Sequence, residues 1–206
     1  MSAALGRLKA GYISGGRRLG LRLMTRFRAV PVTPNQLTVA GLSLNAVAAV
    51  LIYHEHFVWA AVAFIAGSVL DILDGALARS RGTLNPFGGF LDSTTDRMSE
   101  GLVLGAIALV LARQGETWAL ASVFVALVGS FLVSYTRAKA EAIGLRCEVG
   151  LMSRAERIVL IAAALPFAGH GSLPWAVEIL AALTAFTVWQ RIDYVRRQLK
   201  NTHSEV

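Results

Sequence analysis

The sequence predicts an all-α polytopic membrane protein, with six transmembrane helices preceded by an amphipathic juxtamembrane helix. The chain of 206 residues is 55% hydrophobic and has a mean hydropathy of +0.56, above that of a soluble globular domain. Its apolar residues are gathered in long stretches, most of them near the roughly 17–25 residues that span a bilayer. The polar connections between them are too short for soluble domains, so we expect one membrane domain.

The first element, residues 1–30, carries seven basic residues and no acidic one among scattered leucines and aromatics. This pattern predicts a basic amphipathic helix on an anionic membrane face, and a disordered basic tail is the alternative. No apolar run in the segment has the length of a signal peptide. Pro31 and Pro34 separate it from the first span, since proline is favoured at a helix start.

Six transmembrane helices are expected next, at residues 36–54, 57–79, 88–112, 117–139, 155–169 and 174–195. Each stretch is apolar on most of its faces, as is typical of helices in a membrane bundle. We therefore expect a juxtamembrane segment over 1–30, a membrane domain over 31–200 and a C-terminal tail over 201–206.

The basic residues predict the orientation of these helices. If the N-terminus is cytosolic, each of the 20 lysines and arginines except Arg113 falls on the cytosolic side. The positive-inside rule therefore favours a multi-pass protein of the cell (plasma) membrane with both termini in the cytosol. We expect the lipid bilayer as a partner and no nucleic acid.

Four of the five aspartates lie within residues 71–97, at the cytosolic edge of the second and third spans. Asp71 and Asp74 are three residues apart, and Asp92 and Asp96 are four apart, so each pair lies on one helix face. The two helices are antiparallel neighbours joined by a short turn over 80–87, and we expect the pairs to converge. Converging carboxylates in a low dielectric take up protons or bind cations, and oxygen ligands favour Mg²⁺, Mn²⁺ or Ca²⁺.

Glycines and an arginine accompany these aspartates. Gly75, Gly88 and Gly89 leave room for a bulky ligand or a neighbouring helix, and Arg79 can reach phosphate oxygens. Two metals beside an arginine suit a diphosphate, because they neutralise its charge and stabilise the leaving group.

Two other interpretations of the acidic stretch are open. The aspartates could form a cation pathway in a cation-coupled transporter, or they could be interfacial side chains that reach out to water. Pathway acids are usually spread over the depth of the bilayer, whereas these crowd one edge. Their spacing favours the metal site.

As a pattern, the stretch reads D-x2-D-G-x2-A-R-x8-G-x3-D-x3-D, from Asp71 to Asp96. It resembles the signature of the CDP-alcohol phosphotransferase (CDP-alcohol phosphatidyltransferase) family, with every fixed position filled. The similarity extends to a Pro-Asn-x-Leu-Thr entry into the first span, here Pro34 to Thr38, and to six spans after an amphipathic helix. It implies transfer of a phosphoalcohol from a CDP-alcohol to a second alcohol, with release of CMP.

The resemblance also implies roles for individual residues. Asp71, Asp74, Asp92 and Asp96 would hold two divalent metals, Mg²⁺ or alternatively Mn²⁺, and Asp96 would also deprotonate the acceptor hydroxyl. The residues that match CDP-alcohol-binding positions are Asn35, Gly75, Ala78, Arg79 and, in a looser match shared with Thr83, Asn85. The donor would be CDP-diacylglycerol, and members of the family are commonly homodimers.

The acceptor is suggested by basic residues at the cytosolic ends of the last three spans: Arg137, Arg154, Arg157 and Arg191. Arginine binds phosphate through two parallel hydrogen bonds, so this group predicts a phosphorylated polyol as acceptor. The layout resembles the branch of the family that uses inositol phosphate. Glycerol 3-phosphate, the acceptor of phosphatidylglycerophosphate synthases, is the alternative, and the arginines could also serve membrane topology alone.

Overall fold

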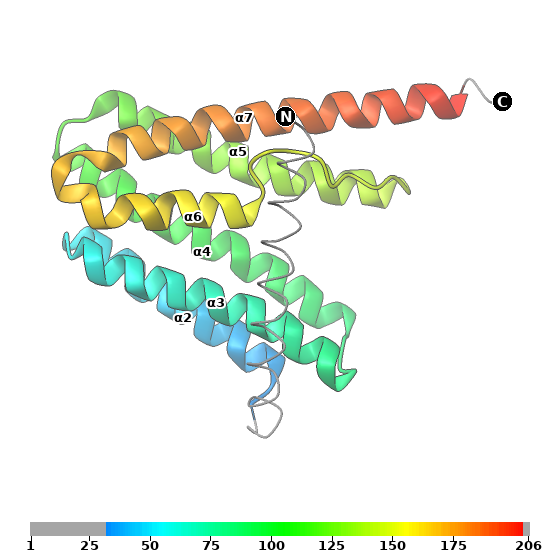
Figure 1. Cartoon of the computed structure of the whole chain (residues 1–206), viewed down its shortest axis with the longest axis horizontal. Helices are drawn as coiled ribbons and strands as arrows, with labels where there is room; N and C mark the ends of the chain where they lie inside the picture. Colours follow the sequence, from blue (N-terminus) through cyan, green and yellow to red (C-terminus); the bar gives the residue numbers. More distant parts are fainter. Residues whose placement is uncertain (1–31, 204–206) are drawn as a thin grey trace, which may run out of the picture.

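The computed structural model describes residues 32–203, and within that range every regular element is helical (Figure 1). The elements are α2 (Pro34–Tyr53), α3 (Phe57–Arg81), α4 (Pro86–Arg113), α5 (Thr117–Ala142), α6 (Arg154–Ala164), η1 (Leu165–His170) and α7 (Ser172–His203). The amphipathic helix predicted over residues 1–30 lies outside the described residues. Of the predicted tail, residues 201–203 continue α7 and the remainder also lies outside.

Helices α2 and α4 begin earlier than the hydropathy pattern predicts. Thr33 and Gln36 form a capping box, in which each side chain accepts a hydrogen bond from the backbone N–H of the other, and Pro34 occupies the first turn. Asn85 caps α4, accepting a hydrogen bond from Gly88 N at 2.7 Å. Gly82 ends α3 with a left-handed φ of 63°, so the turn between α3 and α4 is very short.

The fifth predicted span is divided in two. Residues 154–164 form an α-helix of 11 residues, and the 3₁₀ helix η1 of six residues follows it directly. Pro166 lies at the change and has no N–H to donate to the preceding turn, which explains why the α-helix does not continue. The single uninterrupted helix predicted over 155–169 was therefore wrong in detail.

The helices are arranged so that alternate connections lie at the same end of the molecule. The α3–α4 and α5–α6 connections and the end of α7 lie toward the right of Figure 1, the start of α2 lies near the lower middle, and the other connections lie at the left. Helix α2 packs on α3 and α4, and α5 packs mainly on α7. Toward the right-hand end, α2, α3 and α4 diverge from α5 and α7, and the bundle opens there (Figure 1).

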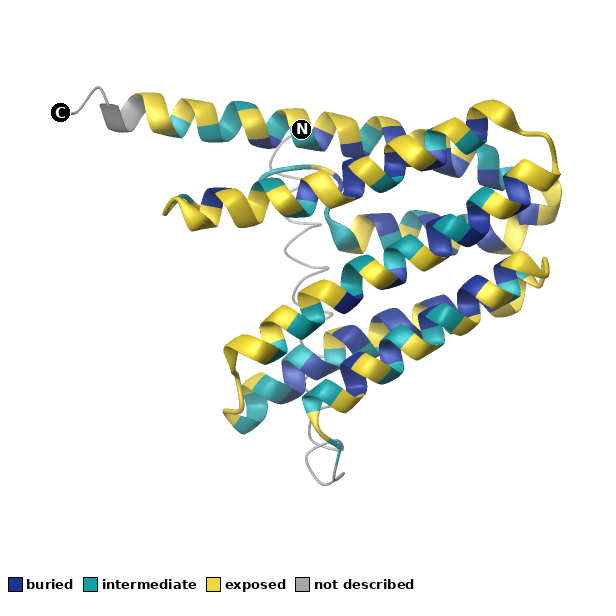
Figure 2. Cartoon of the chain, turned by 180° about the vertical axis from the view of Figure 1, so that it is seen from behind, coloured by how far each residue is buried: buried dark blue, intermediate teal, exposed yellow. Residues whose placement is uncertain are grey.

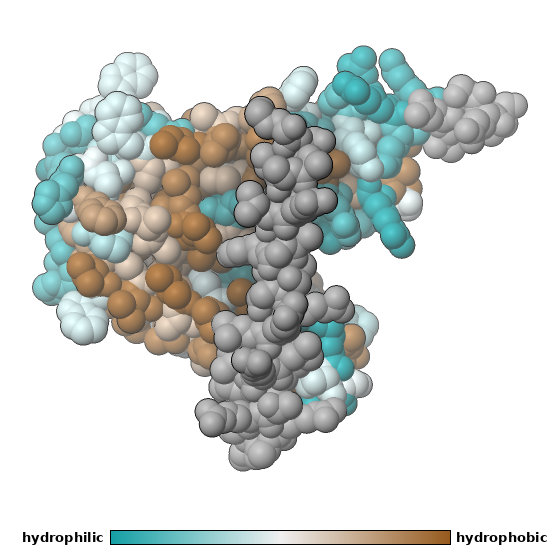
Figure 3. All heavy atoms as spheres, viewed as in Figure 1, coloured by the Kyte–Doolittle hydropathy of each residue, from teal (hydrophilic) through white to brown (hydrophobic). Residues whose placement is uncertain are grey.

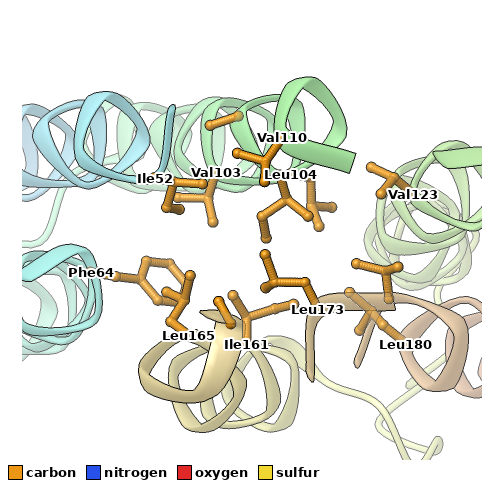
Figure 4. Close-up of a cluster of buried hydrophobic side chains, with 14 of the residues drawn as sticks. Ile52, Phe64, Val103, Leu104, Val110, Val123, Ile161, Leu165, Leu173 and Leu180 are labelled. Carbon is orange, nitrogen blue, oxygen red and sulfur yellow. The ribbon is translucent and has the colours of Figure 1, made fainter. Parts of the chain in front are cut away.

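The hydrophobic core lies at the opposite, closed end. Figure 4 shows side chains from all parts of the bundle meeting there, among them Ile52, Phe64, Leu104, Ile161 and Leu180. Contacts between α2, α3, α4, α6 and α7 therefore fix the closed end as one unit, from which the open end projects.

The outer faces of the bundle are strongly apolar. Exposed residues follow the outside of every helix in Figure 2, and large ones such as Trp59, Phe124 and Trp175 are more than 65% exposed. Brown hydrophobic residues cover much of the left and centre of Figure 3, and hydrophilic residues gather at the free ends of α5 and α7. Four described helices, α2, α3, α5 and α7, are long and apolar enough to cross a membrane. The chain is thus a helical membrane protein.

The packing of α5 on α7 yields a stability prediction. A Cβ at Gly129 would lie 2.5 Å from Oγ1 of the fully buried Thr184, so Gly129→Ala should overpack this contact and destabilise the fold by about 1–3 kcal/mol. The thermal unfolding midpoint in detergent measures the effect. Gly169→Ala is the control, because nothing lies within 4 Å of a Cβ there. Equal midpoints for the two variants would contradict the close approach.

Candidate functional site

The four aspartates lie on the two sides of the α3–α4 turn, at the open end of the bundle. Asp71 and Asp96, from different helices, both approach Nη2 of Arg154, at 2.7 and 2.8 Å. Arg154 is the first residue of α6, so one guanidinium ties three helices together. The predicted convergence of the α3 and α4 carboxylates is therefore present for this pair.

Small residues on α2 explain how Asp71 and Asp74 are buried. A Cβ on Gly41 would lie 2.1 Å from Oδ1 of Asp71 and 3.1 Å from the carbonyl oxygen of Gly67, so α2 and α3 can cross closely only with glycine here. One turn earlier on α2, the buried hydroxyl of Thr38 donates a hydrogen bond to Asp74. Helix α2 thus forms the wall against which the first aspartate pair is held.

The donor set fits hard divalent cations, although the side chains are not arranged around one. Within residues 32–203, no group of three acidic, histidine or cysteine side chains is close enough to hold a metal ion. Arg154 instead supplies positive charge between Asp71, whose side chain is 4% exposed, and Asp96. Four carboxylates within a few turns of helix remain a suitable ligand set for Mg²⁺ or Mn²⁺, provided that Arg154 moves away from them.

One cavity, of about 480 Å³, opens between the starts of α2 and α4 and the end of α3. We call it the glycine-lined cavity; it is lined by Thr33, Pro34, Asn35, Thr38, Asp74, Gly75, Ala78, Arg79, Arg81, Thr83, Leu84, Asn85, Gly88, Gly89 and Asp92. All five residues predicted to bind the CDP-alcohol line it, together with two of the aspartates. The glycines give it an open floor, since a Cβ on Gly89 would meet nothing within 4 Å.

A second cavity, of about 390 Å³, lies between α4, α5, α6 and α7. We call it the arginine-lined cavity; it is lined by Ser93, Asp96, Arg97, Glu100, Val133, Ser134, Arg137, Ala138, Glu141, Ser153, Arg154, Arg157 and Arg191. It contains all four arginines predicted to bind the acceptor, and Asp96 stands at its edge. The aspartates therefore separate two cavities of different chemical character.

The arginines of this cavity are engaged to different extents. Arg157 is only 4% exposed and makes two bonds to Glu100, at 2.6 and 2.9 Å, and a third to the carbonyl oxygen of Met152. Arg191 is also buried and donates to the carbonyl oxygens of Val149 and Val133. Both side chains therefore tie the α5–α6 connection to the bundle.

The other two arginines have partners that a ligand could replace. Arg137 pairs with Glu141 one turn along α5, and both side chains are 51% exposed. Arg154 is held by the aspartates alone among the contacts described above. Of the four predicted acceptor residues, Arg137 and Arg154 thus present the guanidinium groups most available to an incoming anion.

Sequence reasoning missed several members of the site. Glu100 and Arg97 line the arginine-lined cavity and Arg81, which donates to the carbonyl oxygen of Val32 at 2.6 Å, lines the glycine-lined cavity, although no ligand-binding role was predicted for them. Thr38 was noted only as the last residue of the Pro-Asn-x-Leu-Thr entry, and its hydrogen bond to Asp74 was not predicted. Glu100 could have been found, because it follows Asp96 by four residues and shares its helix face. Nothing in the sequence pattern points to its pairing with Arg157, 57 residues away.

The fold and the two cavities can now be compared with known proteins. The chain is a helical membrane protein with a carboxylate-rich centre between a glycine-lined and an arginine-lined cavity. The model of the CDP-alcohol phosphatidyltransferase family matches residues 31–189, and the chain belongs to this family.

Among curated proteins, the chain is similar to archaetidylinositol phosphate synthase of Pyrococcus horikoshii, with 36% identity over 87% of this chain and 92% of that protein. It is 39% identical to phosphatidylinositol phosphate synthase of Corynebacterium glutamicum, over 78% of this chain and 76% of that protein.

Among solved structures, the fold matches phosphatidylinositol phosphate synthase of Mycobacterium tuberculosis with CDP-DAG bound. The TM-score is 0.77 at 27% identity, covering 86% of this chain and 94% of that one. The complex of the same enzyme with manganese and citrate matches with a TM-score of 0.75 at 28% identity, covering 85% and 88%.

The buried Arg157–Glu100 pair yields a prediction. Glu100→Gln leaves a buried guanidinium without its countercharge and should cost roughly 3–5 kcal/mol of stability. The control is Asp193→Asn, which breaks the pair with the 75% exposed Arg197 and should cost at most about 1 kcal/mol. Thermal unfolding in detergent compares them, and a Glu100→Gln variant as stable as the control would show that Arg157 has no structural role.

Proposed function

We propose that this protein is a phosphatidylinositol phosphate synthase. It transfers the phosphatidyl group of CDP-diacylglycerol to a hydroxyl of inositol phosphate and releases CMP. The observation that carries this proposal is the pair of cavities that meet at the aspartates, one lined by the residues of the CDP-alcohol signature and the other by arginines. The names of the similar proteins support an inositol phosphate acceptor.

The proposed membrane arrangement has six crossings, with both termini and both cavities at the cytosolic face of the plasma membrane. Helix α4 contributes a crossing despite the charged residues in its first half, and α6 with η1 contributes another. The positive-inside rule supports this orientation, because the basic residues gather at the open end. Helix α7 has 32 residues and is about 48 Å long, so it extends beyond a hydrocarbon core of about 30 Å.

The aspartates are proposed to hold two divalent cations, Mg²⁺ or Mn²⁺, and the manganese complex of the similar mycobacterial enzyme supports this ligand class. When bound, the metals neutralise the diphosphate and stabilise the departing CMP. Asp74 and Asp92 face the glycine-lined cavity and Asp96 faces the arginine-lined cavity, so the ligand set borders both substrates.

Residues of the chain itself bind the donor. Asn35, Gly75, Ala78, Arg79 and Asn85 bind the cytidine diphosphate part of the donor, and Arg79 contacts its phosphates through charge-assisted hydrogen bonds. The lipid chains remain in the bilayer beside the bundle. Since the donor lies against the backbone of Gly75, Gly88 and Gly89, its β-phosphorus can approach the carboxylate edge.

The acceptor enters the arginine-lined cavity from the water. Arg137 and Arg154 bind its phosphate, while Arg157 and Arg191 shape the cavity through Glu100 and the backbone. Asp96 takes the proton of the acceptor hydroxyl, whose oxygen then attacks the β-phosphorus in line with the departing CMP. Acceptor binding and deprotonation are thereby assigned to side chains that line one cavity.

We also propose a domain division of juxtamembrane segment 1–30, membrane domain 31–200 and tail 201–206, and a homodimeric assembly. Two alternatives to the proposed activity stay open to test. Glycerol 3-phosphate would fit an arginine-lined cavity as an anionic acceptor. A cation-coupled transporter would use the same aspartates, but the family match to CDP-alcohol phosphatidyltransferases weighs against it.

An acceptor panel tests the proposed function. Purified full-length protein with CDP-diacylglycerol and Mg²⁺ should release CMP fastest with inositol phosphate, and EDTA should abolish the release. A higher kcat/KM with glycerol 3-phosphate would assign the other acceptor. No release with inositol phosphate, glycerol 3-phosphate, inositol or serine would reject the transferase and favour transport.

A second prediction concerns metal binding. Because Arg154 competes with cations for Asp71 and Asp96, Arg154→Gln should tighten Mn²⁺ binding by about 10-fold, the equivalent of one charge-assisted hydrogen bond. Mn²⁺ titration followed by electron paramagnetic resonance measures the affinity without turnover. Arg137→Gln, whose partner is Glu141, should leave it unchanged. Weaker Mn²⁺ binding in Arg154→Gln would contradict the competition.

A further inference from the structure

Beneath the arginine-lined cavity lies a much smaller one, of about 20 Å³. The two share four lining residues, Asp96, Glu100, Arg154 and Arg157, so the small cavity adjoins the acceptor side of the site. The remaining wall is mostly apolar, and Figure 4 labels five of its side chains: Phe64, Val103, Leu104, Ile161 and Leu180. Asn45 of α2 and Ser99 of α4 complete the lining.

Asn45 and Ser99 are buried polar residues whose side chains have no protein partner. Asn45 is 0% exposed and neither its Oδ1 nor its Nδ2 makes a hydrogen bond, and Ser99 is 3% exposed with an unpartnered hydroxyl. An unsatisfied buried polar group costs free energy, and a polar residue inside a membrane bundle commonly has a functional role. These two side chains line the same cavity.

Asn45, Ser99 and Asp96 line the same small cavity. Gly67 leaves room for Asn45, because a Cβ there would lie 2.9 Å from Nδ2 of Asn45. Ser99 follows Asp96 by three residues and shares its face of α4. Oδ1 of Asp96 lies 2.8 Å from Arg154 as an ion pair but has no aligned hydrogen bond. Three polar groups with free hydrogen-bonding capacity therefore border one small space.

We propose that this cavity binds one water molecule, which links Asn45 and Ser99 to the carboxylate of Asp96. The volume suits a single water, which needs about 10–15 Å³ of such space and two to four polar partners. The water accepts a hydrogen bond from the Ser99 hydroxyl and donates to Oδ1 of Asp96 and to the Asn45 carbonyl oxygen. Asn45 and Ser99 are then positioning residues that act through the water.

The consequence for the reaction rests on the proposed role of Asp96 as base. The hydrogen bond from the water to Oδ1 of Asp96 fixes the rotation of this carboxylate, so that its Oδ2 is presented to the arginine-lined cavity. Ordering the base before the acceptor arrives lowers the barrier to proton transfer and does not alter the binding of either substrate.

Paired alanine variants test the positioning role. Ser99→Ala should lower kcat by about 10-fold, the effect of one hydrogen bond to a charged group, with unchanged KM for both substrates. Ser130→Ala is the matched control, since Ser130 is 0% exposed and equally unpartnered but lines none of these cavities. Asn45→Leu, which keeps the approximate shape, should repeat the Ser99→Ala result. Equal kcat values for the two alanine variants would overturn the proposal.

A structure of the wild-type protein at a resolution that shows ordered water tests the binding site itself. The expected result is density for one water within hydrogen-bonding distance of Asn45, Ser99 and Asp96, and a dry cavity in a map with other buried waters would overturn the site. This readout is independent of turnover. If the wild type releases no CMP with any acceptor, the proposed function fails while the water site is still decided by the density.

Discussion

The ion pairs of Arg154 with Asp71 and Asp96 are the interaction on which the open end of the bundle depends. Buried carboxylates repel one another, and they lie together in a membrane protein when a proton or a cation neutralises part of their charge. Arg154 supplies positive charge at 2.7 and 2.8 Å, and it joins the ends of α3, α4 and α6. A divalent metal would satisfy the same electrostatic requirement once Arg154 moved away from the carboxylates.

The two cavities follow from how the helices diverge. Gly41 and Gly67 allow α2 and α3 to pack closely. This close packing keeps the first aspartate pair, Asp71 and Asp74, buried. Helices α5 and α7 separate from α4 at the same end, and their arginines line the space that results. A lipid donor and a water-soluble acceptor can thus reach one set of carboxylates from different directions. The closed apolar end holds the helices in this arrangement.

Local sequence patterns predicted most of the helices and the grouping of the signature residues at one end of them. Apolar stretches predicted the helices, and the three- and four-residue spacings predicted that each aspartate pair lies on one helix face. The glycine-lined cavity was predictable because the residues of the motif are close together in the chain. The break at Pro166 was missed, since hydropathy alone does not distinguish an α-helix from a 3₁₀ turn of similar composition.

Long-range partners could not be predicted in the same way. The pairs Arg154–Asp71 and Arg157–Glu100 join residues 83 and 57 positions apart, and no local spacing specifies such contacts. Asn45 and Ser99 are single polar residues in apolar helices, and only the packing shows that they border one cavity with Asp96. Likewise, the positive-inside rule alone would explain four arginines at one end of the bundle, and only their different partners separate Arg157 and Arg191, which bond to Glu100 and the backbone, from the more available Arg137 and Arg154.

Asp96, which lines the arginine-lined cavity, is proposed to act as the base of the transfer. Asp96→Asn removes the proton acceptor while leaving the glycine-lined cavity and the Asp71–Arg154 pair in place. Binding of CDP-diacylglycerol and CMP release should be measured on the same preparation. In Asp96→Asn, binding of CDP-diacylglycerol should persist, while turnover should fall by about 100-fold or more, the scale of general-base removal. Turnover near that of the wild type, or loss of donor binding together with turnover, would contradict this role of Asp96.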